Sequence, residues 1–361
     1  MKKIAIIGSV GLPAKYGGWE TLVDNLTNCL KGQFEFTVFC SAEKYDKKLV
    51  SYNDALLEYI ALDANGVQSI LYDLVSLLKA LRFADVILVL GVSGCIFLPV
   101  IKLFTRKIII VNIDGLEWRR AKWGRFAKWF LKMSEAAAVL SADVVVADNQ
   151  AIQRYLEVQY GKTGKLIAYG SDHALHHDFD DEEKNDYIFS NKRYAFKVCR
   201  IEPENNIHII LQCFKNFDKI NLVIIGNWNN SKYGINLKKE YCNFNHIYLL
   251  DPIYDQKILN KIRGNCYVYI HGHSAGGTNP SLVEAMHLGL PIISFSCDFN
   301  KFTMHQEGLF FYNAEELNDI LVNTSDDDFN RLGIKMKAIA DEFYTWHKIS
   351  EKYAELFFFK K

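Results

Sequence analysis

The chain has 361 residues, which favours two domains over a single hydrophobic core, and its 42 basic side chains balance 42 acidic ones. This balance excludes a general electrostatic attraction to nucleic acid. Half of the residues are hydrophobic, as in ordinary folded proteins, and eight scattered cysteines without a C-x-x-C pair favour reduced thiols in a cytoplasmic protein over disulfides or zinc.

The first half of the chain alternates short apolar runs with helical stretches, a pattern that predicts a parallel sheet with crossover helices. We expect strands at 4–8, 34–40, 86–90, 108–113, 144–147 and 166–168, and helices at 19–30 and 69–83. Residues 86–105 are long enough to cross a membrane, but Gly91, Gly94 and Pro99 divide them into a strand, a turn and a short helix. We therefore expect no membrane span there.

The same rhythm resumes after a polar, acidic stretch at 171–191. We expect strands at 194–199, 222–226, 247–250, 267–271 and 291–295, and helices at 206–217, 235–242, 256–263, 281–288 and 345–359. The prediction is an α/β protein with two Rossmann-like domains, at 1–170 and 171–344, and a C-terminal helix at 345–361 that packs back on the first domain. Ligands of such folds bind beyond the carboxyl ends of the strands, here in the cleft between the domains.

A glycine-rich segment follows the first predicted strand and opens the first helix. It contains Gly8, Gly11, Gly17 and Gly18, which let backbone N–H groups approach a phosphate at a helix N-terminus. The spacing is not G-x-G-x-x-G, and there is no G-x-x-x-x-G-K-[ST]. The segment alone is therefore either a ligand loop or an ordinary turn, and it gives no support to dinucleotide binding or ATP hydrolysis.

Two further motifs follow strands of the second predicted domain. Arg200 begins R-I-E-P-E-N-N, where a guanidinium can bind phosphate oxygens bidentately or form a surface salt bridge. The segment 271–286, H-G-H-S-A-G-G-T-N-P-S-L-V-E-A-M, predicts a strand end, a loop of small residues and a helix start. Its backbone donors suit a diphosphate, and Glu284 lies one turn into the helix, where it can accept hydrogen bonds from ribose hydroxyls. His271 and His273 lack further metal ligands nearby, so we expect structural or substrate-contacting histidines instead of zinc.

Together, G-G-W-E at 17–20, the Arg200 motif and the segment 276–286 resemble the retaining glycosyltransferases of the GT-B fold, in the large family four that includes sucrose synthases and mannosyltransferases. Within that family they resemble the bacterial rhamnosyltransferase branch, over nearly the whole chain. The resemblance implies that Arg200 contacts the donor diphosphate and Glu284 the ribose. The donor-binding residues that it implies are Gly17, Gly18, Arg200, Asn205, Gly276, Gly277, Thr278, Asn279, Ser281, Leu282 and Glu284.

Two positions depart from the pattern of many relatives. Asn205 stands where they have a lysine, and Gly276 stands where they have a glutamate. A phosphate-binding cation and a partner for the donor sugar are therefore missing. Both departures fit the rhamnosyltransferase-like branch; inactivity is the competing explanation, against which stand the intact Arg200 and Glu284.

The acceptor side is predicted from the segment that follows the strand at 108–113. Asp114 is expected to face the cleft, where it positions the acceptor hydroxyl or helps to deprotonate it; a helix-capping role is the alternative. Residues 117–135 are predicted to form one basic helix with an apolar arc, which suits an anionic membrane surface or a lipid-diphosphate acceptor. A core-packed helix with a solvated basic face is the alternative. The acceptor or membrane residues are predicted to be Asp114, Trp118, Arg119, Arg120, Lys122, Trp123 and Arg125.

These features predict a cytoplasmic enzyme, peripheral on the inner face of the cytoplasmic membrane, with Arg200 and Asp114 as its catalytic residues. It is expected to transfer L-rhamnose from dTDP-rhamnose to a lipid-diphosphate-linked saccharide in capsule, O-antigen or cell-wall polysaccharide synthesis. No metal or cofactor is expected, because Arg200, backbone amides and helix dipoles can bind the diphosphate. The alternatives are a UDP-hexose donor on the same fold, a sugar-nucleotide epimerase, and a non-catalytic sugar-binding subunit.

Overall fold

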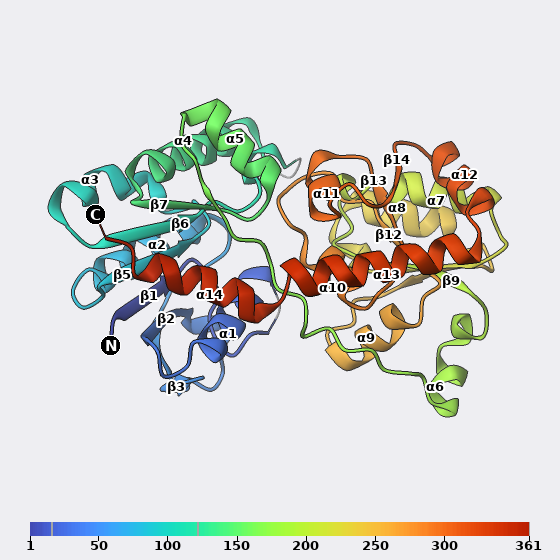
Figure 1. Ribbon diagram of the computed structural model, residues 1–361, viewed down its shortest axis with the longest axis horizontal. Helices are drawn as coiled ribbons and strands as arrows, with labels where there is room; N and C mark the ends of the chain where they lie inside the picture. The colour runs from blue at the N-terminus through green and yellow to red at the C-terminus, as the bar shows by residue number, and fades with distance from the viewer. Residues whose placement is uncertain (16, 121–122, 361) are drawn as a thin grey trace. The chain divides into compact units, whose positions relative to one another are not determined.

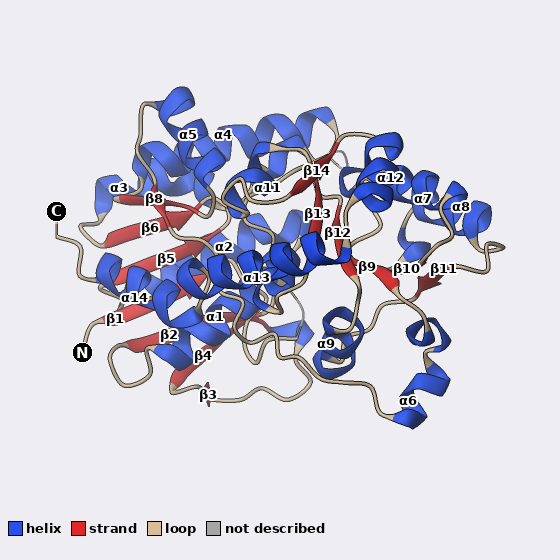
Figure 2. Cartoon of the chain, turned by 45° about the vertical axis from the view of Figure 1, so that its right-hand side comes forward, coloured by secondary structure: helices blue, strands red, loops and turns tan. Residues whose placement is uncertain are grey.

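The structure, a computed structural model, describes residues 1–15, 17–120 and 123–360. The chain divides into two compact units (Figure 1). The first unit consists of Met1–Gly170 together with Trp346–Lys361, and the second of Ser171–Thr345. Each unit contains one largely parallel sheet flanked by helices (Figure 2), which confirms the predicted α/β class.

The sheet of the first unit has the strand order β3-β4-β2-β1-β5-β6-β7-β8, and it is parallel except where β3 pairs with β4. Its strands are β1 (Lys3–Ile7), β2 (Glu35–Ser41), β3 (Ser51–Tyr52), β4 (Ala55–Ile60), β5 (Val86–Leu90), β6 (Ile108–Asn112), β7 (Val144–Ala147) and β8 (Lys165–Leu166). Its helices are α1 (Gly18–Cys29), α2 (Ser69–Ala80), α3 (Leu98–Phe104), α4 (Arg125–Ser141), α5 (Gln150–Tyr160) and α14 (Trp346–Phe357). Short 3-10 turns are η1 (Ala42–Lys44), η2 (Gly66–Gln68), η3 (Cys95–Phe97) and η4 (Glu117–Arg119).

The sheet of the second unit is parallel throughout, with the order β11-β10-β9-β12-β13-β14. Its strands are β9 (Tyr194–Val198), β10 (Asn221–Ile225), β11 (Ile247–Leu250), β12 (Val268–His271), β13 (Ile292–Phe295) and β14 (Leu309–Phe311). Its helices are α6 (Asp181–Asp186), α7 (Ile207–Asn216), α8 (Lys232–Tyr241), α9 (Gln256–Gly264), α10 (Pro280–His287), α11 (Asp298–Thr303), α12 (Ala314–Asn323) and α13 (Asp326–Phe343). The 3-10 turns are η5 (Ile188–Asn191), η6 (Pro203–Asn205) and η7 (Trp228–Asn230).

The apolar runs form the central strands because helices cover both faces of a parallel sheet, so every side chain of such a strand is buried. All five residues of β5 and all five of β10 are buried. Helix α14 adds a late segment to the first unit by packing against α1 (Figure 1). Its aromatic stripe is buried, and the Tyr353 hydroxyl accepts a hydrogen bond from Asn112 Nδ2 at 2.9 Å.

Each sheet has a topological switch point, where the strand order reverses and the next strand pairs with the free side of the first strand. In the first unit β5 follows β4 along the chain but pairs with β1. In the second unit β12 follows β11 but pairs with β9. Because loops diverge at such a point, open α/β sheets bind ligands there, beyond the carboxyl ends of the strands. The loops after β1 and β5, and those after β9 and β12, are therefore the candidate ligand loops.

The segment 86–105 folds as β5, η3 and α3, as its glycines and proline predict. Across the described part of the chain, no helix combines the length and the apolar character needed to cross a bilayer. The predicted single helix at 117–135 is wrong. Residues 117–119 form η4, and α4 begins only at Arg125, after Gly124.

The buried carboxyl of Asp73 on α2 makes the stability of the first unit depend on pH. Its Oδ2 accepts a hydrogen bond from the Gly94 N–H at 3.0 Å, while Oδ1 has no partner among the described atoms. Burial raises the pKa of Asp73 to about 7. In the unfolded chain an aspartate carboxyl has a pKa near ~4. Between this pH and the pKa of the folded state, Asp73 is protonated in the folded protein and ionised in the unfolded protein. The free energy of unfolding should therefore fall as the pH rises from about 4 to 7.

The substitution Asp73→Asn keeps an oxygen for the Gly94 N–H and removes the charge. We expect this variant to match the wild type near pH 4.5 and to exceed its stability at pH 8, by up to about 4 kcal/mol at ~1.4 kcal/mol per pKa unit. Urea unfolding at both pH values measures the difference. Equal pH dependence of the two proteins would contradict the assignment.

Candidate active site

Two loops at the switch point of the second unit are joined by hydrogen bonds, and we call them the paired loops (199–206 and 272–279). Ser274 donates to the Glu204 carbonyl from both its backbone N–H and its hydroxyl, at 2.9 and 3.0 Å. The R-I-E-P-E-N-N and H-G-H-S motifs, which are about 70 residues apart in sequence, are therefore one structural element.

Two asparagines complete the junction of the paired loops. Asn206 Nδ2 donates to the Gly272 carbonyl at 2.8 Å, and Asn205 Nδ2 donates to the Arg200 carbonyl at 2.8 Å. Asn205 Oδ1 lies 2.9 Å from Nδ1 of His273. A Cβ at position 272 would lie 2.3 Å from the Asn205 carbonyl oxygen, so only glycine fits there. The residue that stands in place of a lysine thus has a structural function of its own.

Arg200 follows β9 at the carboxyl edge of the sheet. Half of its side chain is exposed, and its nearest acidic partner is Glu202, 3.9 Å from Nε. An exposed pair at this distance contributes little to stability. The guanidinium can therefore exchange this contact for an anion that binds at the switch point.

The glycines Gly276 and Gly277 form the backbone of the second paired loop before α10. Gly276 has φ +113°, a conformation that residues with a side chain rarely adopt. A Cβ at this position would also lie 3.2 Å from Nε2 of His273. The absence of a glutamate at position 276 therefore has a local physical reason.

Helix α10 begins directly after the second paired loop. The side chain of Asn279 caps it by accepting hydrogen bonds from the N–H and the hydroxyl of Ser281, at 3.0 and 2.8 Å. Thr278 and Leu282 are buried and anchor the loop and the helix start in the core. The helix start is thus a fixed set of backbone donors with the positive end of the helix dipole, which suits a diphosphate.

Glu284 on α10 is held by two side chains that the motifs did not indicate. Its Oε2 accepts a hydrogen bond from the guanidinium of Arg263, and its Oε1 lies 3.1 Å from Nε2 of His173. Arg263 is almost fully buried. Burial alone would raise the pKa of Glu284, but the charge of Arg263 and the contact with His173 outweigh it and lower the pKa. Glu284 is therefore an oriented, ionised acceptor.

His271 lies at the end of β12 with 1% of its surface exposed. Its ring stacks on that of Tyr269 with centroids 6.1 Å apart, and neither ring nitrogen has a hydrogen-bond partner among the described atoms. Burial, with the charge of Lys197 nearby, lowers its pKa well below the usual range, so the ring is neutral. Within the described residues, no group of three or more His, Cys, Asp or Glu side chains could hold a metal ion.

The glycine-rich segment of the first unit is built around a buried carboxylate. Glu20 in the first turn of α1 accepts a hydrogen bond from the Val10 N–H at 2.6 Å, and burial raises its pKa against the effect of this bond. Gly17 has φ +132°, and a Cβ there would lie 2.0 Å from Glu20 Oε2. Gly18 begins α1. The backbone conformation at position 17 therefore favours glycine, and a side chain there would displace the Glu20 carboxylate.

Asp114 follows β6 at the carboxyl edge of the first sheet. It has φ +59°, a left-handed conformation that is uncommon for a residue with a side chain. Its backbone N–H donates to Asn112 Oδ1 at 3.1 Å. The next helical segment, η4, starts only at Glu117. Asp114 therefore does not cap a helix.

The indole groups of Trp118 and Trp123, predicted to lie on the membrane-facing arc, are half-buried and hydrogen-bonded within the first unit. Trp118 Nε1 donates to the buried Glu135 at 2.9 Å, and Trp123 Nε1 donates to Glu117 at 3.0 Å. Arg120 pairs with the same Glu117 at 3.0 Å. These contacts place both tryptophans away from the stripe of α4, which corrects the predicted arc.

Of the basic residues assigned to this region, Arg119 lies with its guanidinium carbon 5.2 Å from the Trp118 ring centre, and Arg125 is exposed at the start of α4. Lys122 lies outside the described residues. The apolar stripe of α4 itself is exposed instead of core-packed: Phe126 is 77% exposed and Trp129 59%.

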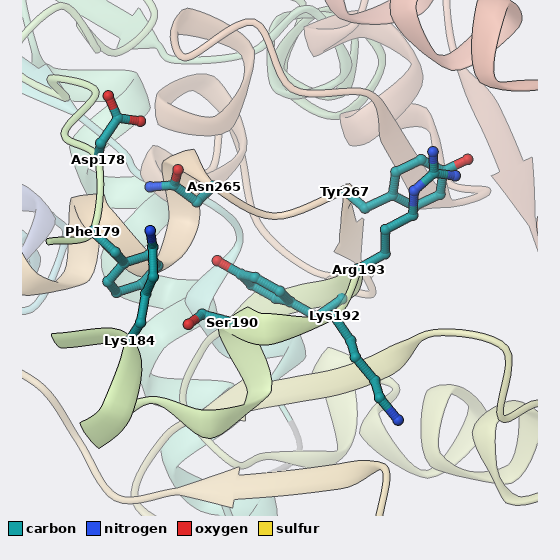
Figure 3. Close-up of a pocket in the computed structure, with 9 residues that line it drawn as sticks. Asp178, Phe179, Lys184, Ser190, Lys192, Arg193, Asn265 and Tyr267 are labelled. Atoms are coloured by element: carbon teal, nitrogen blue, oxygen red, sulfur yellow. The ribbon is translucent and has the colours of Figure 1, made fainter. Parts of the chain in front are cut away.

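A hollow of about 580 Å³ in the second unit is lined by Lys192, Arg193 and Tyr267, among others (Figure 3). Lys192 and Arg193 precede β9, and Tyr267 precedes β12. The hollow therefore lies at the amino edge of the sheet, opposite the paired loops, and it is not the candidate active site.

Two open, largely parallel α/β sheets, each with candidate ligand loops at its switch point, are the architecture of the GT-B fold of glycosyltransferases. Residues 178–321 match the family described as "Glycosyl transferases group 1", and residues 1–172 match the family described as "Domain of unknown function (DUF1972)". The group 1 match, which covers residues 178–321, supports sugar transfer. No curated protein matches the sequence.

Solved structures of the same fold match over nearly the whole chain. Sucrose-phosphate synthase from Thermosynechococcus elongatus is 15% identical with a TM-score of 0.83, covering 99% of this chain and 98% of its own. Anabaena HepE in complex with UDP is 16% identical with a TM-score of 0.76, covering 98% and 99%. Trehalose-6-phosphate synthase OtsA is 11% identical with a TM-score of 0.73, covering all of both chains. These matches confirm the predicted fold.

Proposed function

We propose that the protein is a retaining glycosyltransferase whose donor is dTDP-L-rhamnose and whose acceptor is a lipid-diphosphate-linked saccharide in surface polysaccharide synthesis. The observation that carries the transferase assignment is the pair of loops at the β9–β12 switch point, with an available arginine on one and a capped helix start after the other. These are the groups that a nucleoside diphosphate requires.

The proposed residue roles are those that the family resemblance implies, and this arrangement supports them. Arg200 binds the diphosphate and stabilises the charge that develops on it as the sugar departs. The backbone from Gly277 to Leu282 cradles the sugar-phosphate, and Glu284 accepts hydrogen bonds from the ribose. In the first unit, the loop at Gly17 and Gly18 is assigned to the donor phosphates, as the family resemblance implies.

A thermal-shift screen of nucleotide-sugars tests the donor. Preferential stabilisation by dTDP-L-rhamnose, by several degrees at saturating ligand, is the expected result, because ligands that bind only the folded state raise its stability by mass action. Stabilisation by UDP-hexoses alone would overturn the rhamnose assignment. Turnover of a UDP-sugar without an acceptor would identify an epimerase, and donor binding without transfer to any acceptor would identify a non-catalytic subunit.

Asp114 is proposed to position the acceptor hydroxyl or to help deprotonate it. Its left-handed backbone at the carboxyl edge of the sheet supports this, because strained residues concentrate at functional sites. We expect Asp114→Asn to lower kcat by about 100-fold or more with little change in donor affinity. Full activity of Asp114→Asn would contradict the catalytic assignment. The substitution removes the charge and the basicity of the carboxylate but leaves the size of the side chain nearly unchanged.

Peripheral membrane contact is proposed for the exposed stripe of α4. Phe126, Trp129 and Met133 lie on one face, with Arg125 and Lys128 beside them, and such a mixed surface suits anionic lipid headgroups. The wild type should float with liposomes that contain anionic lipid, and Phe126→Ser/Trp129→Ser should not.

The matched control for this experiment is Ile334→Ser, which removes an equally exposed apolar side chain, 72% accessible, from α13 of the second unit. Charge reversal at Arg125 and Lys128 should also abolish flotation. Flotation that survives both the stripe and the charge variants would exclude membrane contact through α4.

A further inference from the structure

Three aromatic rings of the first unit surround the ammonium group of Lys132 on α4. Its Nζ lies 4.6 Å from the ring centre of Trp118, 4.7 Å from that of Tyr155 and 5.1 Å from that of Tyr160. Trp118 belongs to η4, and the two tyrosines belong to α5. The contacts therefore join three segments of the chain, and we call these four residues together with Glu135 of α4 the ring cluster.

The ring cluster contains one carboxylate, which is occupied by the other members. Glu135 is 1% exposed, and its Oε2 accepts a hydrogen bond from Trp118 Nε1 at 2.9 Å. Its Oε1 accepts hydrogen bonds from the hydroxyl groups of Tyr155 and Tyr160, at 2.5 and 2.7 Å, and from the ammonium group of Lys132 at 3.2 Å. Burial, followed by the hydrogen bond to Glu135, raises the pKa of both tyrosines, so neither hydroxyl ionises near neutral pH. The one negative charge of the cluster is therefore balanced by Lys132.

Arg119 adds a second positive charge to the same rings. Its guanidinium carbon lies 5.2 Å from the ring centre of Trp118 and 5.6 Å from that of Tyr155. The residue is exposed, and its side chain has no hydrogen bond or ion pair among the described residues, whereas the neighbouring Arg120 is paired with Glu117 at 3.0 Å. Ring contacts restrict a guanidinium without using its N–H donors, and these donors can bind a phosphate bidentately.

The charges around the shared rings do not cancel. Arg119 and Lys132 are two cations on the same two rings, and Glu135 supplies one negative charge, so one positive charge remains. Like charges at short range repel each other, and an anion bound by the guanidinium removes this repulsion. The ring cluster with Arg119 is therefore suited to an anion.

An apolar ridge on α4 leads to this charge. Phe126 and Trp129 are exposed, and their ring centres lie 5.9 Å apart. Trp129 and Lys132 are three residues apart on the helix, which places them on the same side of it. A phosphate-binding guanidinium beside an exposed apolar ridge suits an amphiphilic anion, that is, a phosphate group attached to a long apolar chain.

We propose that Arg119, held by the rings of Trp118 and Tyr155, binds the diphosphate of the lipid-linked acceptor, and that the apolar chain of the acceptor lies along Phe126 and Trp129. The inference rests on the proposed acceptor class. It assigns to the first unit a phosphate site of its own, in addition to the donor site at Arg200. Trp118 and Tyr155 are positioning residues of this site.

Geranyl diphosphate is the probe, because it has a diphosphate and an apolar chain but no nucleoside. The chain has six tryptophans, and nitrogen-15 NMR of the full chain separates their indole N–H signals. The signal of Trp118, identified by its loss in Trp118→Phe, should shift when geranyl diphosphate is added. The concentration dependence of this shift gives the affinity at the ring cluster alone, whatever the probe does at Arg200.

Arg119→Met should weaken this affinity by about 10- to 100-fold, as loss of a charged hydrogen bond predicts. Arg119→Lys keeps the charge but not the planar fork of donors, so it should weaken the affinity less than Arg119→Met does. Calorimetric affinities for dTDP and UDP should be unchanged in both variants, because the nucleotide is assigned to the second unit.

The matched control is Arg82→Met, which removes an exposed arginine just after α2 in the same unit, where no ring contact is found among the described residues. This variant should bind geranyl diphosphate as wild type does. Geraniol, which has the apolar chain without the diphosphate, should not shift the Trp118 signal at the same concentrations. The midpoint of urea unfolding verifies that each variant is folded.

The outcomes distinguish this site from the proposed function. No shift of the Trp118 signal in the wild type, or an unchanged affinity in Arg119→Met, would show that the assignment of Arg119 is wrong. Equal weakening in Arg119→Met and Arg82→Met would indicate a general basic field and would also overturn it. If only flotation with phosphatidylglycerol vesicles depends on Arg119, the residue binds phospholipid headgroups and the acceptor assignment is wrong. If neither dTDP nor UDP binds the wild type, the proposed donor fails, whatever geranyl diphosphate does.

Discussion

Replacing Arg263 with methionine is expected to lower the free energy of unfolding by about 3–5 kcal/mol and to abolish measurable nucleoside diphosphate binding. The guanidinium is almost fully buried against Glu284, and removal of one partner leaves the other charge buried without compensation. The carboxylate would then protonate, because burial alone raises its pKa. Urea unfolding and calorimetry with dTDP and UDP measure the two effects.

The pH dependence of this variant identifies the cause. The pKa of Glu284 in the wild type is lowered, so its ion pair stabilises the fold above the unfolded pKa near ~4.3 and is lost below it. In Arg263→Met the carboxyl is neutralised easily, so the deficit should be largest at pH 7.5 and should shrink toward pH 5. The double variant Arg263→Met/Glu284→Gln has neither charge and should recover most of the stability without recovering nucleotide binding. If Arg263→Met were as stable as the wild type at pH 7.5, the buried Arg263–Glu284 pair would be excluded as a source of stability.

Arg200→Met should weaken the affinity for nucleoside diphosphates by 10- to 100-fold, with an unfolding free energy within about 0.5 kcal/mol of wild type. A charged hydrogen bond to an anion contributes about 1.5–3 kcal/mol, whereas an exposed side chain with a partner at 3.9 Å contributes little to the fold. The measurement needs no acceptor substrate, because calorimetry with dTDP and UDP reports the affinity directly.

The chain offers a matched control in Arg193→Met. Arg193 precedes β9 at its amino end, as Arg200 follows it at its carboxyl end, and the two side chains are 59% and 51% exposed. Arg193 pairs with Asp326, away from the paired loops. This variant should bind nucleotides as wild type does. Equal losses in the two variants would mean that a general basic field, and not the position of Arg200, attracts the diphosphate.

The central strands and the paired loops were predictable because each depends on local patterns. The runs that became β5 and β10 are uninterrupted and apolar, and the segment 271–286 shows its strand end, glycine loop and cap within 16 residues. By contrast, β4 was not predicted, because its apolar run is short and interrupted by Glu58.

The partners of the site residues could not be predicted, because they come from distant parts of the chain. Nothing in the sequence distinguishes Arg263 from the lysines on the same helix, and His173 lies in a polar stretch without a pattern. The periodicity at 117–135 led to the wrong prediction of a single amphipathic helix, because tryptophan is counted as an apolar residue in such a pattern. In the structure the indole N–H groups of Trp118 and Trp123 donate hydrogen bonds to carboxylates, which the pattern does not indicate.

The way α14 completes the first unit determines when that unit can fold during synthesis. Trp346 packs against Gly170 and Tyr169, and Tyr353 holds Asn112, so the first sheet lacks part of its cover until this helix exists. A ribosome delivers the whole of 171–345 before it delivers α14. The second unit, which contains the paired loops, can therefore reach its final packing first, and the first unit, although it is begun earlier, is finished last.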